Sequence, residues 1–141
     1  EVKQKLNVET LEKVPAIMVS HILLPNVDDT NPASMSKTII TDILRRDLNF
    51  DGVVVSDDMT MGAITNDYDI SEACIKAINA GTDLLLVCHG YDNEVKVINS
   101  IKEAVNNKII SMDRIDESVY RILSLKENYK LSDAMNKIRD K

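Results

Sequence analysis

The sequence predicts an α/β fold, namely the C-terminal part of a (β/α)8 TIM-type barrel with about three parallel strands that alternate with helices. Three short apolar runs support this class, at residues 14–20, 53–55 and 83–88. The strand-to-strand repeats are roughly 37 and 31 residues, which leaves room for one crossover helix in each βαβ unit. The runs are largely apolar without strict alternation, as expected for strands buried on both faces of a parallel sheet.

A barrel is favoured because such strands need a cover on each face. In a (β/α)8 barrel the helices cover the outside and the strands fill the inside. Three strands alone would leave the inward side chains of residues 53–55 and 84–86 exposed. We therefore expect either self-association or a missing N-terminal barrel half as a partner. An independent, small three-stranded α/β domain is the alternative.

Composition indicates a globular protein without a basic surface. The chain has 141 residues, of which 44% are hydrophobic and 28% are charged, and its net charge is −6. This balance argues against a nucleic-acid partner, and no apolar run is long enough to span a membrane. We expect an N-terminal extension at residues 1–13 that does not resemble a secretory signal, βα units of the barrel at 14–128, and a polar C-terminal tail at 129–141.

The first strand candidate, residues 14–20, is followed by His21 and a loop rich in Pro, Asp and Asn. A helix is then expected to start near Ser36, which suits an N-cap position. Its apolar residues share one face at helical spacing: Ile39, Ile40, Ile43, Leu44 and Leu48. The second strand is expected at residues 53–55.

Three further helices are predicted. Asp69 and Glu72 have the spacing of a capping box, and Gly81 marks the end of that helix. The third strand, at residues 83–88, precedes a helix at about 93–106, and Asp113 is expected to cap a fourth. The inward positions predicted for the last two helices are Val97, Ile98, Ile101, Val105, Ile115, Val119, Ile122 and Leu123.

Three polar residues come directly after the three strands: His21, Asp57 and His89. In parallel α/β folds these positions meet at one rim, where active sites are built. From the pattern alone, Asp57 is either a catalytic carboxylate or, with Asp58, the cap of a short helix. Asp58 fits a cap or a charge that tunes its neighbour better than a second catalytic acid. Both histidines are equally compatible with ordinary hydrogen bonding in loops.

The remaining candidates for chemistry are weaker. Cys74 and Cys88 lie in predicted core segments and are expected to be buried free thiols. A metal site built from His21, Asp57 and His89 lacks any motif spacing, so we predict none. A serine-based triad lacks the expected nucleophile-elbow motif.

Six segments in order resemble glycoside hydrolase family 3, in particular its β-N-acetylglucosaminidase branch. The resemblance covers about residues 14–128. The segments are PAIMVSH at 15–21, NPASMS at 31–36, ILR at 43–45, FDGVVVSDDMTM at 50–61, AGTDLLL at 80–86 and RIDESVYRIL at 114–123.

This resemblance implies retaining hydrolysis of terminal β-linked N-acetylglucosamine from cell-wall-type glycans, with no cofactor. It implies that Asp57 is the catalytic nucleophile and that Met61 lies beside the bound sugar. We take Met61, His21 and Asp58 as the candidate substrate-binding residues. The family's acid/base histidine belongs to a Lys-His-Phe-Pro-Gly-His-Gly-Asp type motif, which this sequence does not contain.

We therefore expect this chain alone to be inactive, although it belongs to an enzyme family. A non-catalytic α/β module that binds sugar or self-associates is the rival interpretation, and a small α/β response-type domain with an acidic pocket is a third. The resemblance leaves the compartment open, because relatives work in the bacterial cytoplasm or outside it.

Overall fold

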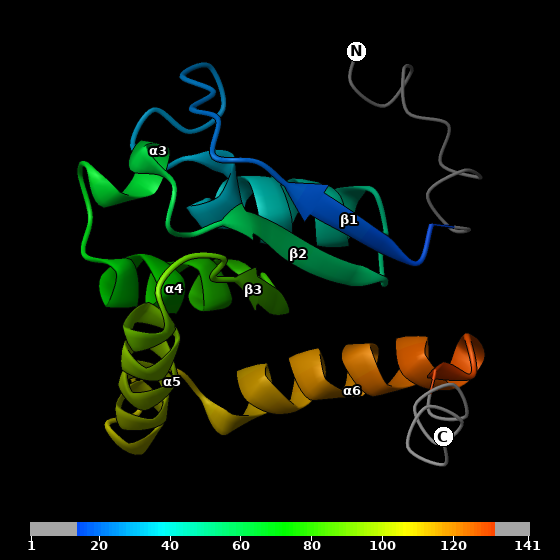
Figure 1. Cartoon of the computed structure of the whole chain (residues 1–141). Helices are drawn as coiled ribbons and strands as arrows, with labels where there is room; N and C mark the ends of the chain where they lie inside the picture. Colours follow the sequence, from blue (N-terminus) through cyan, green and yellow to red (C-terminus); the bar gives the residue numbers. More distant parts are fainter. Residues whose placement is uncertain (1–13, 132–141) are drawn as a thin grey trace.

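A parallel three-stranded sheet forms the centre of the protein (Figure 1). The computed structural model describes residues 14–131. The strands lie side by side in chain order, β1 (Ala16–Val19), β2 (Val53–Asp58) and β3 (Leu84–Leu86). Both strand pairs are parallel. The predicted α/β class with three parallel strands is confirmed, and all three strands occur within the predicted segments or extend them.

Helices connect and follow the strands. In chain order they are η1 (Ala33–Met35), η2 (Thr38–Asp47), α3 (Gly62–Thr65), α4 (Ile70–Ala80), α5 (Tyr91–Asn106) and α6 (Met112–Asn128). The expected N-terminal extension at 1–13 lies outside the described residues, as does the C-terminal tail beyond residue 131.

The first crossover helix differs in type from the prediction. η2 is a π-helix, and the amide of Leu48 donates to the carbonyl of Ile43 five residues earlier. It begins at Thr38, two residues after the expected cap. Ser36 nevertheless acts near its start, since its hydroxyl accepts the amide proton of Ile39 at 3.2 Å.

The second crossover helix begins and ends as predicted. The Asp69 side chain accepts a hydrogen bond from the amide of Ser71 at 2.9 Å and so caps α4. Gly81 ends the helix in the left-handed conformation, with φ of 115°. A Cβ atom at this position would lie 2.9 Å from the Ile40 side chain, so the turn needs glycine for both its backbone and its space.

The last two helices require corrections. Ser111, and not Asp113, caps α6 by accepting the amide of Arg114 at 3.1 Å. Both residues are good caps, and the chain closes the turn at the earlier one. Three predicted inward side chains are exposed: Ile98, Val119 and Leu123. Of these, Ile98 and Val119 line an open cavity between β3, α5 and α6.

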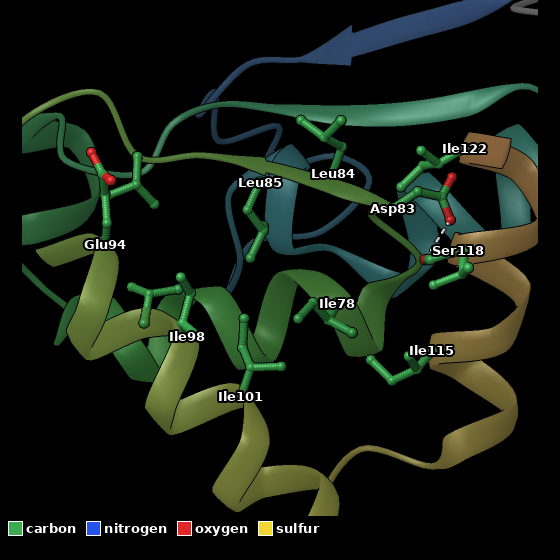
Figure 2. Close-up of a pocket in the computed structure, with 13 residues that line it drawn as sticks. Ile78, Asp83, Leu84, Leu85, Glu94, Ile98, Ile101, Ile115, Ser118 and Ile122 are labelled. Atoms are coloured by element: carbon green, nitrogen blue, oxygen red, sulfur yellow. Dashed lines mark hydrogen bonds between the residues drawn. The ribbon is translucent and has the colours of Figure 1, made fainter. Parts of the chain in front are cut away.

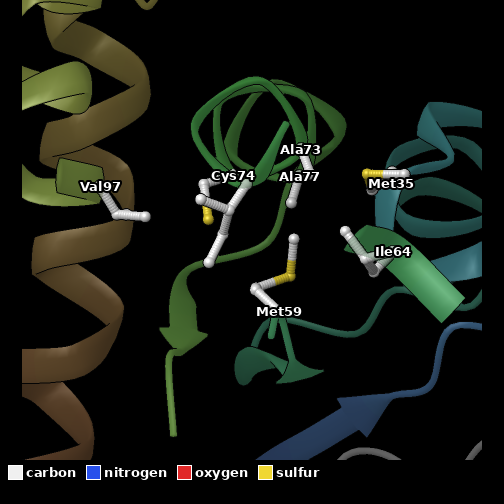
Figure 3. Close-up of a cluster of buried hydrophobic side chains, with 8 residues drawn as sticks. Met35, Met59, Ile64, Ala73, Cys74, Ala77 and Val97 are labelled. Carbon is white, nitrogen blue, oxygen red and sulfur yellow. The ribbon is translucent and has the colours of Figure 1, made fainter. Parts of the chain in front are cut away.

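The core lies between the sheet and the helices that cover one of its faces. Figure 3 shows Met59, which follows β2, extending toward α4, with Ile64 on one side and Cys74 on the other. A second cluster joins Val54 to Ile40 of η2 and to other apolar side chains around it. This packing fixes the direction of β2 and therefore the place where its polar end emerges.

The opposite face of the sheet is partly open. Met18 is 59% exposed, although its neighbours in β1 pack into the core. Val55 and the residues of β3 are half-buried. Val53 was expected to be exposed in a three-stranded fragment, but it is buried, and α6 contacts β2.

A buried charge cluster holds the amino-terminal ends of the strands. Asp83 immediately precedes β3, and its side chain is 0% exposed. It accepts hydrogen bonds from three guanidinium groups, from the Ser118 hydroxyl at 2.8 Å and from the Val54 amide at 2.9 Å. The three donors are Arg45 at 2.5 Å, Arg114 at 2.7 Å and Arg121 at 3.3 Å. The cluster therefore joins η2, β2, β3 and α6 at the end of the sheet opposite the candidate site.

Candidate active site

Strand β2 carries both acidic residues of the candidate site. It was expected to end at Val55, but the structure extends it through Asp57 and Asp58. Successive side chains on a strand point to opposite faces. The two adjacent carboxylates on this strand therefore lie in different surroundings. Only one of them accepts hydrogen bonds from several protein donors.

The Asp58 carboxylate is saturated with protein donors. One oxygen accepts the amides of Thr60 and Cys88, each at 3.0 Å. The other lies 3.1 Å from Nδ1 of His89, and the Thr60 hydroxyl reaches both oxygens at 2.6–2.7 Å. Although burial acts to raise it, these hydrogen bonds hold the pKa of the Asp58 carboxyl well below its usual value. Asp58 thus links the end of β2 to the segment that follows β3.

The backbone carbonyl of Asp58 binds His21. Nε2 of His21 lies 3.0 Å from that oxygen, and Nδ1 lies 2.6 Å from the hydroxyl of the buried Ser34. The histidine after β1 therefore bridges the end of β2 and the short helix η1. Both of its ring nitrogens have protein partners.

Asp57 is bound much more loosely. Its Oδ1 accepts the amide of Asp58 at 2.8 Å. For Oδ2 of Asp57, residues 14–131 provide no hydrogen-bond donor, and the side chain is half-buried. Asp57 does not cap α3, whose N-cap is Met61. A positioned carboxylate with one free oxygen is suited to nucleophilic attack or to acid/base chemistry.

The polar residues that follow the three strands come together, but they meet at Asp58 and not at Asp57. His21 and His89 each contact Asp58, His21 through the Asp58 carbonyl and His89 through the Asp58 carboxylate. The expectation that polar residues after the strands meet at one rim is therefore confirmed for these side chains. The pattern singled out Asp57, but the structure makes its neighbour the centre of the hydrogen-bond network.

The methionines near this rim have separate environments. Met59 is fully buried in the core, whereas Met61 is 43% exposed after the end of β2. The exposed thioether of Met61 offers an apolar surface on the same segment as the carboxylates. Its predicted contact with a sugar remains a prediction.

The cysteines also differ from each other. Cys74 is buried in α4, as predicted, and burial raises the pKa of its thiol to about 12. Cys88 is exposed, which corrects the expectation that it lies in the core. The reason is that β3 ends at Leu86, so the chain has already reached the rim at residue 88.

At least three cavities occur among the described residues, and Asp57 lines none of these three. One, of about 510 Å³, lies between β3, α5 and α6 and is mostly apolar (Figure 2). The Asp83–Ser118 hydrogen bond lies at one end of it, while Ile98 and Ile101 project into it from α5. This apolar cavity is therefore separate from the Asp57 carboxylate.

Within residues 14–131 there is neither a cluster of metal-ligating side chains nor a membrane-spanning helix. No group of three or more His, Cys, Asp or Glu side chains in this range is arranged to hold a metal ion. Within the same range, no helix is both long and apolar enough to cross a bilayer.

Two polar residues that support this rim, Ser34 and Thr60, were not among the predicted site residues. Ser34 contacts His21 across 13 residues of chain, and Thr60 contacts His89 across 29. Both lie in segments that resemble the family, NPASMS and FDGVVVSDDMTM. Their place in these segments was the available sequence signal, but it did not identify the hydrogen-bond partner of either residue.

Comparison with known proteins supports the resemblance. The family model described as "Glycosyl hydrolase family 3 N terminal domain" matches residues 8–125. A β-hexosaminidase of Bordetella parapertussis is 36% identical over 102 residues, which cover 72% of this chain and 28% of that protein.

Solved structures agree with this comparison. A glycoside hydrolase family 3 β-N-acetylglucosaminidase from Paenibacillus sp. str. FPU-7 is 40% identical, with a TM-score of 0.80 over 82% of this chain and 22% of its own. The β-N-acetylglucosaminidase from Thermotoga maritima is 28% identical, with a TM-score of 0.77 over 84% of this chain and 26% of its own. The chain thus spans about a quarter of the length of these relatives and contains part of their (β/α)8 barrel.

Proposed function

Because this chain belongs to glycosyl hydrolase family 3, we propose that it carries the nucleophile of a retaining β-N-acetylglucosaminidase, and that this nucleophile is Asp57. The observation that carries the proposal is the asymmetry at the end of β2. The Asp58 carboxylate is filled by donors, whereas Asp57 keeps one oxygen free of protein hydrogen bonds within residues 14–131. The relatives named above as β-hexosaminidase and β-N-acetylglucosaminidase support the proposed substrate class.

The proposed reaction is a double displacement. The free oxygen of Asp57 attacks the anomeric carbon, the bond to the leaving oxygen breaks, and a glycosyl ester forms on the carboxylate. A general acid protonates the leaving oxygen and then, as a base, activates the water that hydrolyses the ester. Asp57 suits the first role because its carboxylate has an oxygen free to attack and sits on a strand that limits its movement.

The substrate side of the site follows from exposure. Met61 offers an accessible apolar surface for one face of the sugar ring. His21 and Asp58 are proposed next to it, but any contact of theirs with a sugar hydroxyl must share the hydrogen bonds that they already make. A terminal β-linked N-acetylglucosamine on a cell-wall-type fragment is the substrate that we propose.

We further propose that this chain alone is inactive. The sequence lacks the Lys-His-Phe-Pro-Gly-His-Gly-Asp type motif of the acid/base loop, and general acid/base catalysis is typically worth roughly 10²–10⁴ in rate. The exposed Met18 and the apolar cavity beside β3 support a partner on these surfaces, either the remaining barrel segments or a second copy.

The first experiment measures turnover of an aryl β-N-acetylglucosaminide with an activated leaving group. We expect background rates from this chain alone and turnover from a polypeptide that also supplies the remaining barrel strands. In that polypeptide, Asp57→Ala should abolish turnover, while Asp58→Ala should reduce it less. Equal losses, or a harmless Asp57→Ala change, would show that Asp57 is not the nucleophile.

A second experiment separates an enzyme from a sugar-binding module. A slowly hydrolysed fluorinated N-acetylglucosaminyl substrate should add its glycosyl mass to the peptide that contains Asp57, and Asp57→Ala should prevent this. Binding of N-acetylglucosamine without any covalent adduct or turnover would favour the non-catalytic module.

A further inference from the structure

The contacts of His21 suggest a role other than binding the substrate. Its ring lies between the Ser34 hydroxyl, at 2.6 Å from Nδ1, and the Asp58 carbonyl, at 3.0 Å from Nε2. Ser34 is fully buried, and its own carbonyl accepts the Thr82 hydroxyl at 3.3 Å. The His21 ring is therefore held in place by a hydrogen bond to a residue of the buried interior.

The partners determine which ring nitrogen carries the proton. A carbonyl oxygen can only accept, so Nε2 must be the donor toward Asp58. In the neutral ring, Nδ1 is then the acceptor of a hydrogen bond that the Ser34 hydroxyl donates. The His89 ring has the opposite arrangement, since its Nδ1 faces the Asp58 carboxylate at 3.1 Å and an ionised carboxylate only accepts.

Asp58 transmits this constraint to its neighbour. Its carbonyl is held by His21 and its carboxylate by the segment after β3, so its backbone has little freedom to rotate. The amide of the same residue donates to Oδ1 of Asp57 at 2.8 Å. The direction of that amide decides which oxygen of Asp57 is occupied and where the free oxygen points.

We propose that His21, braced by Ser34, is a positioning residue that restrains the backbone of Asp58 through its carbonyl and thereby the Asp58 amide that orients the carboxylate of Asp57. This inference rests on the proposed function, because it matters for catalysis only if Asp57 attacks the sugar. It assigns His21 an indirect role through the backbone, which requires no contact with the substrate. A misplacement of about 1 Å at a reacting group can cost roughly 10²-fold in rate.

The geometry is tested on this chain by ¹H–¹⁵N correlation of the histidine rings at neutral pH. We expect the His21 proton on Nε2, protected from rapid exchange with water, and a proton on Nδ1 of His89. Ser34→Ala should accelerate exchange of the His21 proton. A His21 proton on Nδ1, or one that exchanges as fast as that of a free imidazole, would overturn the proposal.

The catalytic consequence is tested in the polypeptide that supplies the whole barrel. His21→Leu should lower kcat and kcat/KM together by about 10–100-fold per folded site. His21→Gln keeps a donor near the position of Nε2 and should recover at least tenfold of this loss. A purely structural role would lower the melting temperature of His21→Leu and leave kcat per folded site unchanged, which contradicts the proposal.

The two proposals fail in different ways. If Asp57→Ala retains turnover, the proposed function falls, and the kinetic part of this inference falls with it. If Asp57→Ala is inactive but His21→Leu retains its kcat, or His21→Gln gives no recovery, only the positioning role is overturned. If His21→Leu does not fold, the comparison of His21→Gln with Ser34→Ala decides, because only Ser34→Ala removes the brace and should lower kcat.

Discussion

The amide nitrogen of Asp58 lies 2.8 Å from Oδ1 of Asp57, so one acidic residue orients the other. The carboxylate of Asp58 is simultaneously filled by donors from Thr60 and from the segment after β3. Two adjacent residues of the same type therefore have different chemical capacities. One is a structural anion, and the other retains an oxygen that can form a new bond.

The first prediction concerns the stability that Asp58 provides. Its folded pKa lies below the unfolded value of about 3.9, so its contribution is complete above that pH and declines as the pH falls. Hydrogen bonds to a charged group are worth about 1.5–3 kcal/mol. Asp58→Asn should therefore lower the free energy of unfolding at pH 7, and the difference from the wild type should shrink below about pH 4. Urea titrations at several pH values measure this, and a difference independent of pH would contradict it.

The second prediction concerns the buried cluster around Asp83. Asp83→Asn would leave Arg45, Arg114 and Arg121 facing a neutral group in a poorly solvated site. Removing one partner of a buried ion pair typically costs about 3–5 kcal/mol, and we expect a loss of this size in urea unfolding.

The matched control for Asp83 is Asp42→Asn on the surface of η2. Asp42 pairs with Arg46 at 2.9 Å, and the Arg46 side chain is 68% exposed. Exposed pairs contribute about 0–1 kcal/mol. Equal effects of the two substitutions would show that the Asp83 cluster does not hold the amino-terminal ends of the strands together.

The sequence was sufficient for the parts of the fold that depend on local chemistry. The apolar runs predicted the three strands, and Asp69 and Gly81 marked the two ends of α4 because caps and left-handed turns favour particular residue types. The boundary of α6 was less certain, since Ser111 and Asp113 are both good caps two residues apart. The structure begins the helix after the first of them.

The long-range contacts could not be predicted in this way. Asp83 and Arg121 are 38 residues apart, and no local pattern pairs them. The π-type hydrogen bonding of η2 is equally hidden, because its apolar spacing also fits an ordinary helix. At the candidate site, the sequence identified the rim and its acids. It could not show that both histidines meet Asp58, since that depends on the lengths of β2 and β3.

The third prediction concerns the loop after β1. Asp28 accepts the hydroxyl of Ser36 at 2.6 Å, and this bond, followed by two backbone amides, lowers the pKa of the Asp28 carboxyl to about 2. The stabilisation is present above the unfolded value of about 3.9 and is lost as the pH falls toward 2. Ser36→Ala should raise the pKa of Asp28 toward its ordinary value, as followed by ¹³C NMR of the carboxyl group. Asp29, whose carboxylate Ser36 does not contact, serves as the internal control. An unchanged Asp28 titration in Ser36→Ala would contradict the assignment.

The fourth prediction concerns the two thiols. Cys74 is buried, and its pKa is raised to about 12. Cys88 is exposed, and desolvation together with the Asp58 carboxylate raises the pKa of its thiol. The thiolate is the reactive form of cysteine. A thiol reagent at pH 8 should therefore label only Cys88, and slowly, in the native protein, and both Cys74 and Cys88 in denaturant. Asp58→Asn should accelerate labelling of Cys88, and Cys88→Ser should abolish the native reaction. Rapid labelling of Cys74 without unfolding, or no acceleration in Asp58→Asn, would show that the Asp58 charge does not act on the residue after β3.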